Sequence, residues 1–185
     1  MRITDIGIRK YLSDYRFSER PDENGRVRRE AVYVGDYYTL TDPVRGGRCR
    51  KLVPWLCAGG WAGFLAALLP LSAGAATVYA LLPLAFSALP LGIASAALPA
   101  LLRSKAPMVR ADAERISSAL PGALLWAAIL SGAALVGEGI LALTGPERLL
   151  PGDGVFTLGA AIECAFAAAG RTRRSALATE KKDAR

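Results

Sequence analysis

The sequence predicts an all-α membrane protein: a four-transmembrane-helix bundle of two helical hairpins, with both chain ends in the cytoplasm and a small cytosolic N-terminal β-hairpin or meander. Four apolar runs, at about 52–71, 78–102, 120–144 and 154–170, are each near the length that crosses roughly 30 Å of hydrocarbon. Lys and Arg flank one side of these runs, which is the positive-inside pattern of membrane proteins. Length and charge placement together therefore predict the fold class.

The composition favours a membrane over a nucleic acid as the partner of this basic chain. The 185 residues suit one domain, 52% of them are hydrophobic, and the formal net charge is +7. The apolar residues are concentrated after Lys51, and all but one of the Lys and Arg residues lie outside the loop around Arg148. The sequence has no nucleic-acid motif, so we expect a lipid bilayer and no nucleic acid.

Cysteine and histidine usage argues against a disulfide framework and against metal chemistry. The three cysteines, Cys49, Cys57 and Cys164, are odd in number and have no CxxC spacing, and the chain has no histidine. Cys57 and Cys164 fall within apolar runs, where we interpret them as small buried packing residues. We expect no cofactor and no metal. The N-terminus is too polar for a cleaved signal peptide, so the later apolar runs must drive membrane insertion.

Residues 1–51 are predicted to form a cytosolic segment that ends in a basic linker from Asp42 to Lys51. A short helix is expected over 4–12, and the residues 21–25 form a strong turn cluster.

Two short runs in the same segment, 31–34 and 37–40, are rich in strand-forming residues. Gly35 and Asp36 between them fit a two-residue hairpin turn. Because so small a hairpin is barely stable alone, we expect it to lean on the membrane domain or on a partner.

The membrane domain is predicted to cover 52–170. Gly59 and Gly63 form a GxxxG pair in the first span, a spacing that lets helices approach closely but does not identify a partner. The second span contains three prolines, which serve either as hinges or, as we favour, to shape the bundle. After it, an amphipathic interfacial helix is expected from Val109, with a bend into the third span at Pro121.

The charged segments predict the orientation. The N-terminus, the loop 103–118 and the tail 171–185 are basic and therefore cytoplasmic, whereas the connections 72–77 and 145–153 face outward. The cytoplasmic (plasma) membrane is the expected location. Basic residues beside the spans are expected to contact lipid headgroups: Arg45, Arg48, Arg50, Lys51, Arg103, Lys105, Arg171, Arg173 and Arg174.

Glu138 and Glu163 are the sharpest functional candidates. Each lies within an apolar span that contains no Lys, Arg or His, and each falls in a strip of small residues that should face other helices. An unpaired carboxylate at such a depth is expected to hold its proton and is a functional-site hypothesis by default. The expected helix-packing residues are Gly59, Gly63, Gly159 and Ala167.

The expected depths are similar, because Glu138 is roughly 9 Å from the outer end of its span and Glu163 roughly 13 Å from the start of its own. The two carboxyl groups are thus predicted to be able to approach one another across the hairpin. The alternative is a structural role: a protonated Glu hydrogen-bonds a neighbouring helix through Ser87, Ser95 or Ser131, or Glu138 reaches the outer headgroups.

Three function classes remain open. The first is a non-enzymatic subunit or scaffold of a membrane complex, bound to another membrane protein or to a second copy. The second is a small transporter, proton-coupled and dimeric, that uses Glu163 and Glu138. The third is an intramembrane enzyme, which we do not expect, because the sequence has no catalytic triad and no metal-ligand cluster.

Overall fold

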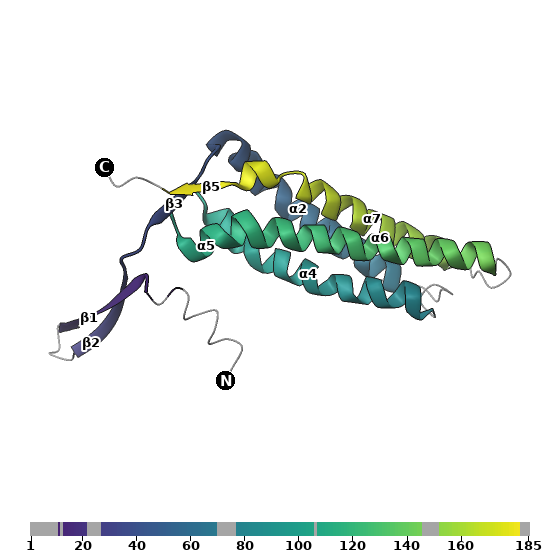
Figure 1. Cartoon of the computed structure of the whole chain (residues 1–185), viewed down its shortest axis with the longest axis horizontal. Coiled ribbons are helices and arrows are strands. Elements are labelled where there is room, and N and C mark those ends of the chain that lie inside the picture. The colour runs from purple at the N-terminus through teal and green to yellow at the C-terminus, as the bar shows by residue number, and fades with distance from the viewer. Residues whose placement is uncertain are drawn as a thin grey trace.

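We describe the protein from a computed structural model, in which residues 11, 13–21, 27–69, 77–105, 107–145 and 152–181 are placed well enough to describe. The chain is mostly helical, with a small N-terminal β-hairpin (Figure 1). Four helices are long and apolar enough to cross a membrane. They are α2 (Pro43–Leu68), α4 (Val78–Arg103), the helix that ends in α6 (Leu120–Thr144), and α7 (Asp153–Arg171).

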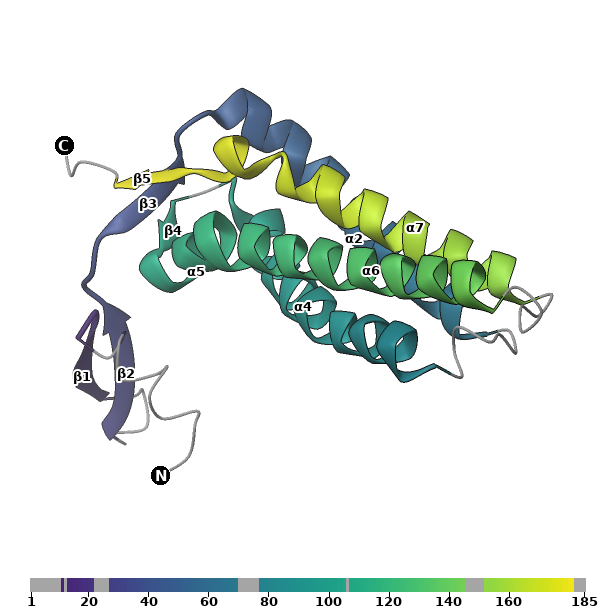
Figure 2. The same cartoon turned by 45° about the vertical axis from the view of Figure 1, so that its right-hand side comes forward.

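The four helices close into a ring. α2 packs against α7 and α4, and α6 packs against α4 and α7, so α2 faces α6 and α4 faces α7 across the centre. Figure 2 shows the helices lying side by side, with the strands gathered at one end. We call this the sheet end, and the opposite one the far end.

The basic segment expected to be a linker is instead the beginning of α2. Asp42 is the N-cap, and its carboxylate accepts a hydrogen bond from the Arg45 backbone N–H at 2.9 Å, which satisfies one donor of the first turn. Pro43 occupies the first turn, where its missing N–H costs nothing. The helix therefore starts nine residues before the predicted span, and its first turns carry the basic residues.

The third long helix also begins before its predicted span. α5 (Arg110–Glu114) and a π-helical turn (Arg115–Ala119) run into α6 without a break, giving one helix from Arg110 to Thr144. Pro121, where the sequence predicts a bend, does not break this helix, and the turn directly before it is π-helical, with the Leu120 N–H bonded to the Arg115 carbonyl oxygen. The π-turn directly before it is where the amphipathic part meets the apolar part.

Of the two turns predicted in the N-terminal segment, one lies between paired strands. β1 (Tyr15–Pro21) pairs antiparallel with β2 (Val27–Tyr33), so the chain reverses between residues 21 and 27, where the sequence has its turn cluster. The predicted hairpin turn at Gly35 and Asp36 is wrong, since the strand after it does not return to β2. The helix expected over 4–12 falls outside the described residues, apart from Tyr11.

A second sheet holds three distant parts of the chain together at the sheet end. β3 (Tyr37–Leu40) lies between β4 (Met108–Val109) and β5 (Thr179–Lys181), antiparallel to both. Leu40 and Met108 are buried beside Leu177, which belongs to a 3₁₀ turn (Arg174–Leu177). β3 gains two partners and a buried face by leaving β2, which explains why the chain turns away at Gly35.

Burial follows the helix faces that the sequence predicts. In α7, Gly159, Glu163, Ala167 and Gly170 are buried, whereas Val155 and Leu158 are exposed. In the same way α6 buries Ala127, Ser131, Ala134 and Glu138, but Ala142 of the predicted face is exposed. Large apolar side chains therefore cover the outside of the bundle, as expected of helices that contact lipid.

Candidate functional site

Glu163 lies at the centre of the bundle. Its exposed fraction is 0%, and neither carboxyl oxygen has a hydrogen-bond partner among the described residues. The side chain comes from the buried face of α7. A polar group enclosed in this way is costly unless a neighbour can share its proton or its lone pairs.

Two serine hydroxyls lie at the level of Glu163. The Ser87 hydroxyl group of α4 interacts with the Glu163 carboxyl group from across the ring, and both side chains are fully buried. Its hydroxyl hydrogen is donated elsewhere, to the Leu84 carbonyl oxygen at 2.6 Å, and the buried Ser131 of α6 donates to the Ala127 carbonyl oxygen at 2.8 Å. Because the Ser87 hydroxyl hydrogen is donated to Leu84, the Ser87 oxygen can accept a hydrogen bond from a protonated Glu163 carboxyl group.

The third serine considered from the sequence belongs to a different contact. The Trp61 indole N–H donates to the Ser95 hydroxyl oxygen at 2.9 Å, and Ser95 in turn donates to the Leu91 carbonyl oxygen at 2.9 Å. This pair joins α2 to α4 and uses Ser95 both as an acceptor and as a donor.

Glu163 also sits where two helix backbones touch. A Cβ built on Gly63 of α2 would lie 2.6 Å from the Glu163 backbone nitrogen and 2.7 Å from the Gly159 carbonyl oxygen. A Cβ on Gly159 would lie 2.5 Å from the Ala67 nitrogen, and one on Gly59 would lie 2.7 Å from the Phe166 ring. Glycine at these positions lets α2 and α7 approach closely. We call this contact the glycine seam; Ala167, the fourth predicted packing residue, is buried on the same face of α7.

Glu138 lies nearer the far end, close to a residue that the sequence interpretation missed. Its exposed fraction is 4%, and its carboxyl oxygens have no hydrogen-bond partner among the described residues. Asp153, at the start of α7, is 6% exposed, and its carboxylate interacts electrostatically with Glu138. The sequence signal was available: Asp153 stands directly before the fourth apolar run, so a hairpin between the last two spans brings it toward the end of the third.

The two glutamates do not lie at the same level, contrary to the expectation. The Cys164 thiol contacts the Ala128 carbonyl oxygen at 3.5 Å, and a Cβ on Gly170 would meet the Leu124 side chain. This register places Glu163 beside the stretch 129–131 of α6. Glu138 is seven to nine residues further along, which corresponds to roughly 10–13 Å of helix.

The basic residues gather at the sheet end, around the ends of the bundle helices. In the part of the chain that the structure describes, Arg45 pairs with Asp42, Arg110 with Glu114 and Arg115 with Asp112. Arg103 donates to the Pro99 carbonyl oxygen at 3.1 Å. The remaining predicted headgroup residues have no acidic partner within the described residues: Arg48, Arg50, Lys51, Lys105, Arg171, Arg173 and Arg174.

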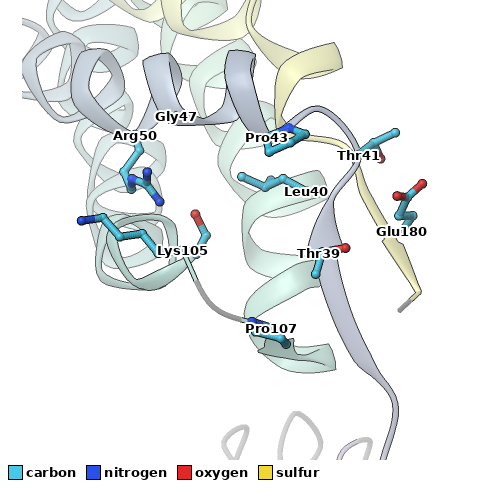
Figure 3. Close-up of a pocket in the computed structure, with 10 residues that line it drawn as sticks. Thr39, Leu40, Thr41, Pro43, Gly47, Arg50, Lys105, Pro107 and Glu180 are labelled. Carbon is cyan, nitrogen blue, oxygen red and sulfur yellow. The ribbon is translucent and has the colours of Figure 1, made fainter. Parts of the chain in front are cut away.

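Two cavities at the sheet end are lined by such unpaired cations. One, of about 520 Å³, lies between β3, the start of α2 and the end of α4, and receives Arg50 and Lys105 (Figure 3). The other, of about 680 Å³, is lined by Arg171 and Arg174. A third cavity, of about 550 Å³, is an apolar groove between α4 and α6. Glu163 and Glu138 line none of these three cavities.

Taken together, the described residues form a buried carboxyl group beside the Ser87 hydroxyl at the centre and a set of cations without acidic partners at one end. Among them, no group of three or more Cys, Asp or Glu side chains is arranged to hold a metal ion. Comparison of the chain with models of known protein families, with characterised proteins and with solved structures found no match.

Proposed function

We propose that the chain is an integral membrane protein that serves as a non-enzymatic subunit or scaffold of a membrane complex. Its four long helices cross the cytoplasmic membrane, and the sheet end, with both termini, faces the cytoplasm. The exposed apolar outside of the bundle and the unpaired cations at the sheet end support this placement.

The observation that carries the subunit role is the hairpin formed by β1 and β2, which stands off the bundle (Figure 1). Within the described residues, β1 and β2 pack chiefly on each other. The hairpin is tied to the rest of the protein at its base, where the Arg110 backbone N–H donates to the Tyr33 hydroxyl oxygen at 3.1 Å. An isolated hairpin is marginally stable, and its strand edges can pair with a partner strand, so a soluble partner or partner subunit is its natural support.

The test is a pull-down of the tagged full chain from native membranes in mild detergent, with measurement of the mass of the intact particle. We expect a stoichiometric foreign membrane protein or a soluble partner bound to it. A variant in which residues 16–32 are replaced by a short Gly-Ser loop should insert into the membrane and lose that partner. Recovery of the chain alone, or as a homodimer, would contradict the subunit role.

The fully buried Glu163 favours a second candidate function, a small proton-coupled transporter that works as a dimer. A buried carboxyl group beside the Ser87 hydroxyl can hold and release a proton if the bundle opens. Glu163→Gln keeps the shape of the side chain and removes its acidity, so proton-driven flux in liposomes should fall at least about ten-fold while the protein still inserts. Glu138→Gln is the comparison variant. Flux that is equal in wild type and in Glu163→Gln would exclude this candidate.

A further inference from the structure

The cavity between β3, α2 and α4 is lined by two cations that come from different helix ends. Arg50 lies in the third turn of α2, and Lys105 follows the last turn of α4. Figure 3 shows both side chains on the same side of β3, next to each other at the cavity. Arg50 is half-buried and Lys105 is exposed. The fold therefore brings two positive charges to one concave place.

Neither of these charges is neutralised by an acidic side chain that the structure describes. Arg50 and Lys105 have no acidic partner within the described residues, whereas Arg45, five residues before Arg50 in the same helix, pairs with Asp42 at 3.3 Å. The acidic residue at this cavity, Glu180 of β5, lies across β3 from the two cations (Figure 3). Two like charges at one cavity repel each other, and a bound anion removes this repulsion.

The rest of the lining shows what kind of anion fits. Leu40, Pro43 and Pro107 give the cavity an apolar part, and the Ser104 hydroxyl hydrogen is already donated to the Leu101 carbonyl oxygen at 2.7 Å. A volume of about 520 Å³ is large enough for a headgroup-sized molecule and larger than a single small ion needs. A ligand with one anionic group beside a less polar body matches these surfaces.

We propose that this cavity binds a phosphate-bearing ligand, held by Arg50 and Lys105. The planar guanidinium group of Arg50 can donate to two phosphate oxygens at once, and the ammonium group of Lys105 adds a point charge. Arg50 stands two residues before the predicted first span, at headgroup depth, so the expected source is an anionic phospholipid. The choice of a lipid source rests on the proposed membrane placement; the phosphate chemistry does not.

The experiment measures ligand binding to the detergent-purified full chain by native mass spectrometry and by the shift in unfolding temperature. The probes are dioctanoyl phosphatidic acid, dioctanoylglycerol, which lacks the phosphate, and inorganic phosphate. The test variant is Arg50→Gln with Lys105→Gln. The matched control is Arg48→Gln with Lys51→Gln, which removes the same charge from exposed, unpaired positions beside the cavity that do not line it.

We expect phosphatidic acid to bind, and its affinity to fall at least about ten-fold in the Arg50/Lys105 variant and less than about three-fold in the control. Binding of phosphatidic acid but not of inorganic phosphate identifies a lipid source, and equal protection by inorganic phosphate identifies a soluble phosphate compound. The proposal is overturned if the two double variants lose affinity equally, if dioctanoylglycerol binds as well as phosphatidic acid, or if no phosphate probe binds. These outcomes do not depend on whether a partner protein is recovered in the pull-down.

Discussion

At the scale of single residues, the bundle depends on positions where a side chain has no room. The glycine seam brings the backbones of α2 and α7 together, so a methyl group added at Gly63 or Gly159 meets backbone atoms that cannot rotate away. Gly154, in the first turn of α7, has open space around it instead. The seam can therefore be tested with a pair of equally small substitutions in one helix.

Gly159→Ala should push α7 away from α2 and reduce the free energy of unfolding by about 1–3 kcal/mol. Its Cβ would lie 2.5 Å from the Ala67 nitrogen, whereas a Cβ on Gly154, in the first turn of α7, would meet nothing within 4 Å. Thermal unfolding in detergent should show a lower midpoint for Gly159→Ala and a change within about 0.5 kcal/mol for Gly154→Ala. Equal effects of the two variants would mean that the seam is not a close contact.

Tyr33 at the hairpin base gives a prediction about pH. Partial burial raises the pKa of its phenol above the ordinary value of 10.0, the Arg110 N–H bond opposes this, and Asp14 adds to the increase. The fold therefore favours the neutral phenol: its contribution to stability is complete below about pH 10 and is lost as pH rises through the raised pKa. The difference between the tyrosinate absorbance titrations of wild type and Tyr33→Phe should show one tyrosine that titrates above pH 10. A difference titration centred at or below pH 10 would contradict the burial.

At the scale of elements, the three-stranded sheet connects the N-terminal segment, the loop before the third long helix and the C-terminal segment. Removal of β5 would take away the pairing partner of β3 from Tyr38 to Leu40 and leave β4 as its neighbour among the described strands. Ion pairs contribute much less here. Lys181 reaches Asp36 at 2.9 Å, but both side chains are more than half exposed, and such pairs stabilise little.

Truncation of the chain after Leu177 should therefore loosen the sheet end. We expect faster cleavage between residues 33 and 43 in limited proteolysis, because β3 loses the backbone hydrogen bonds and burial that β5 supplies. Lys181→Ala keeps the strand and removes the ion pair, so its cleavage rate should stay near that of wild type. If Lys181→Ala were as sensitive as the truncation, the charge pair and not the strand would hold this end together.

At the scale of the whole molecule, the proposed orientation places all the strands on one side of the membrane. This can be tested with single cysteines in a variant whose Cys49, Cys57 and Cys164 are replaced by Ala. A membrane-impermeant maleimide added to intact cells should label Thr144→Cys, an exposed position at the far end, and not Ser175→Cys, an exposed position at the sheet end. Ser175→Cys should react only after permeabilisation. The reverse pattern would invert the orientation, and equal labelling would contradict a membrane-spanning bundle.

The sequence predicted the helices well because long apolar runs and helical periodicity are local signals. The small-residue face that contains Glu163 was readable from residue spacing alone. Two features depended on contacts between distant parts of the chain. β3 leaves β2 for partners some seventy and one hundred and forty residues away, as the pairs of Tyr38 with Met108 and with Lys181 show. The level of Glu163 relative to Glu138 depends on the axial register between α6 and α7. Residue spacing within each helix does not determine this register.

The site was predictable in part for the same reason. Both glutamates stand out as charges in apolar runs, and the basic residues stand out as a group. The sequence did not show which two cations share a cavity. Arg50 and Lys105 come together only because α2 packs beside α4 and β3 lies next to both. Asp153 was missed because it stands one residue outside the predicted span.

The glycine seam has a consequence for the order of events during synthesis. It joins the first and the last of the four long helices, so the seam face of α2 has no partner until α4, α6 and the whole of α7 have left the ribosome. α7 is the least apolar of the four and carries Glu163, so it is the helix that enters lipid least readily by itself. The unpaired seam face of α2 would bind α7 as it inserts, and the Glu163 carboxyl group would then be out of contact with lipid. Insertion of the last helix and closure of the bundle would then be a single step, and a nascent chain that stops before α7 would leave the seam face of α2 without its partner.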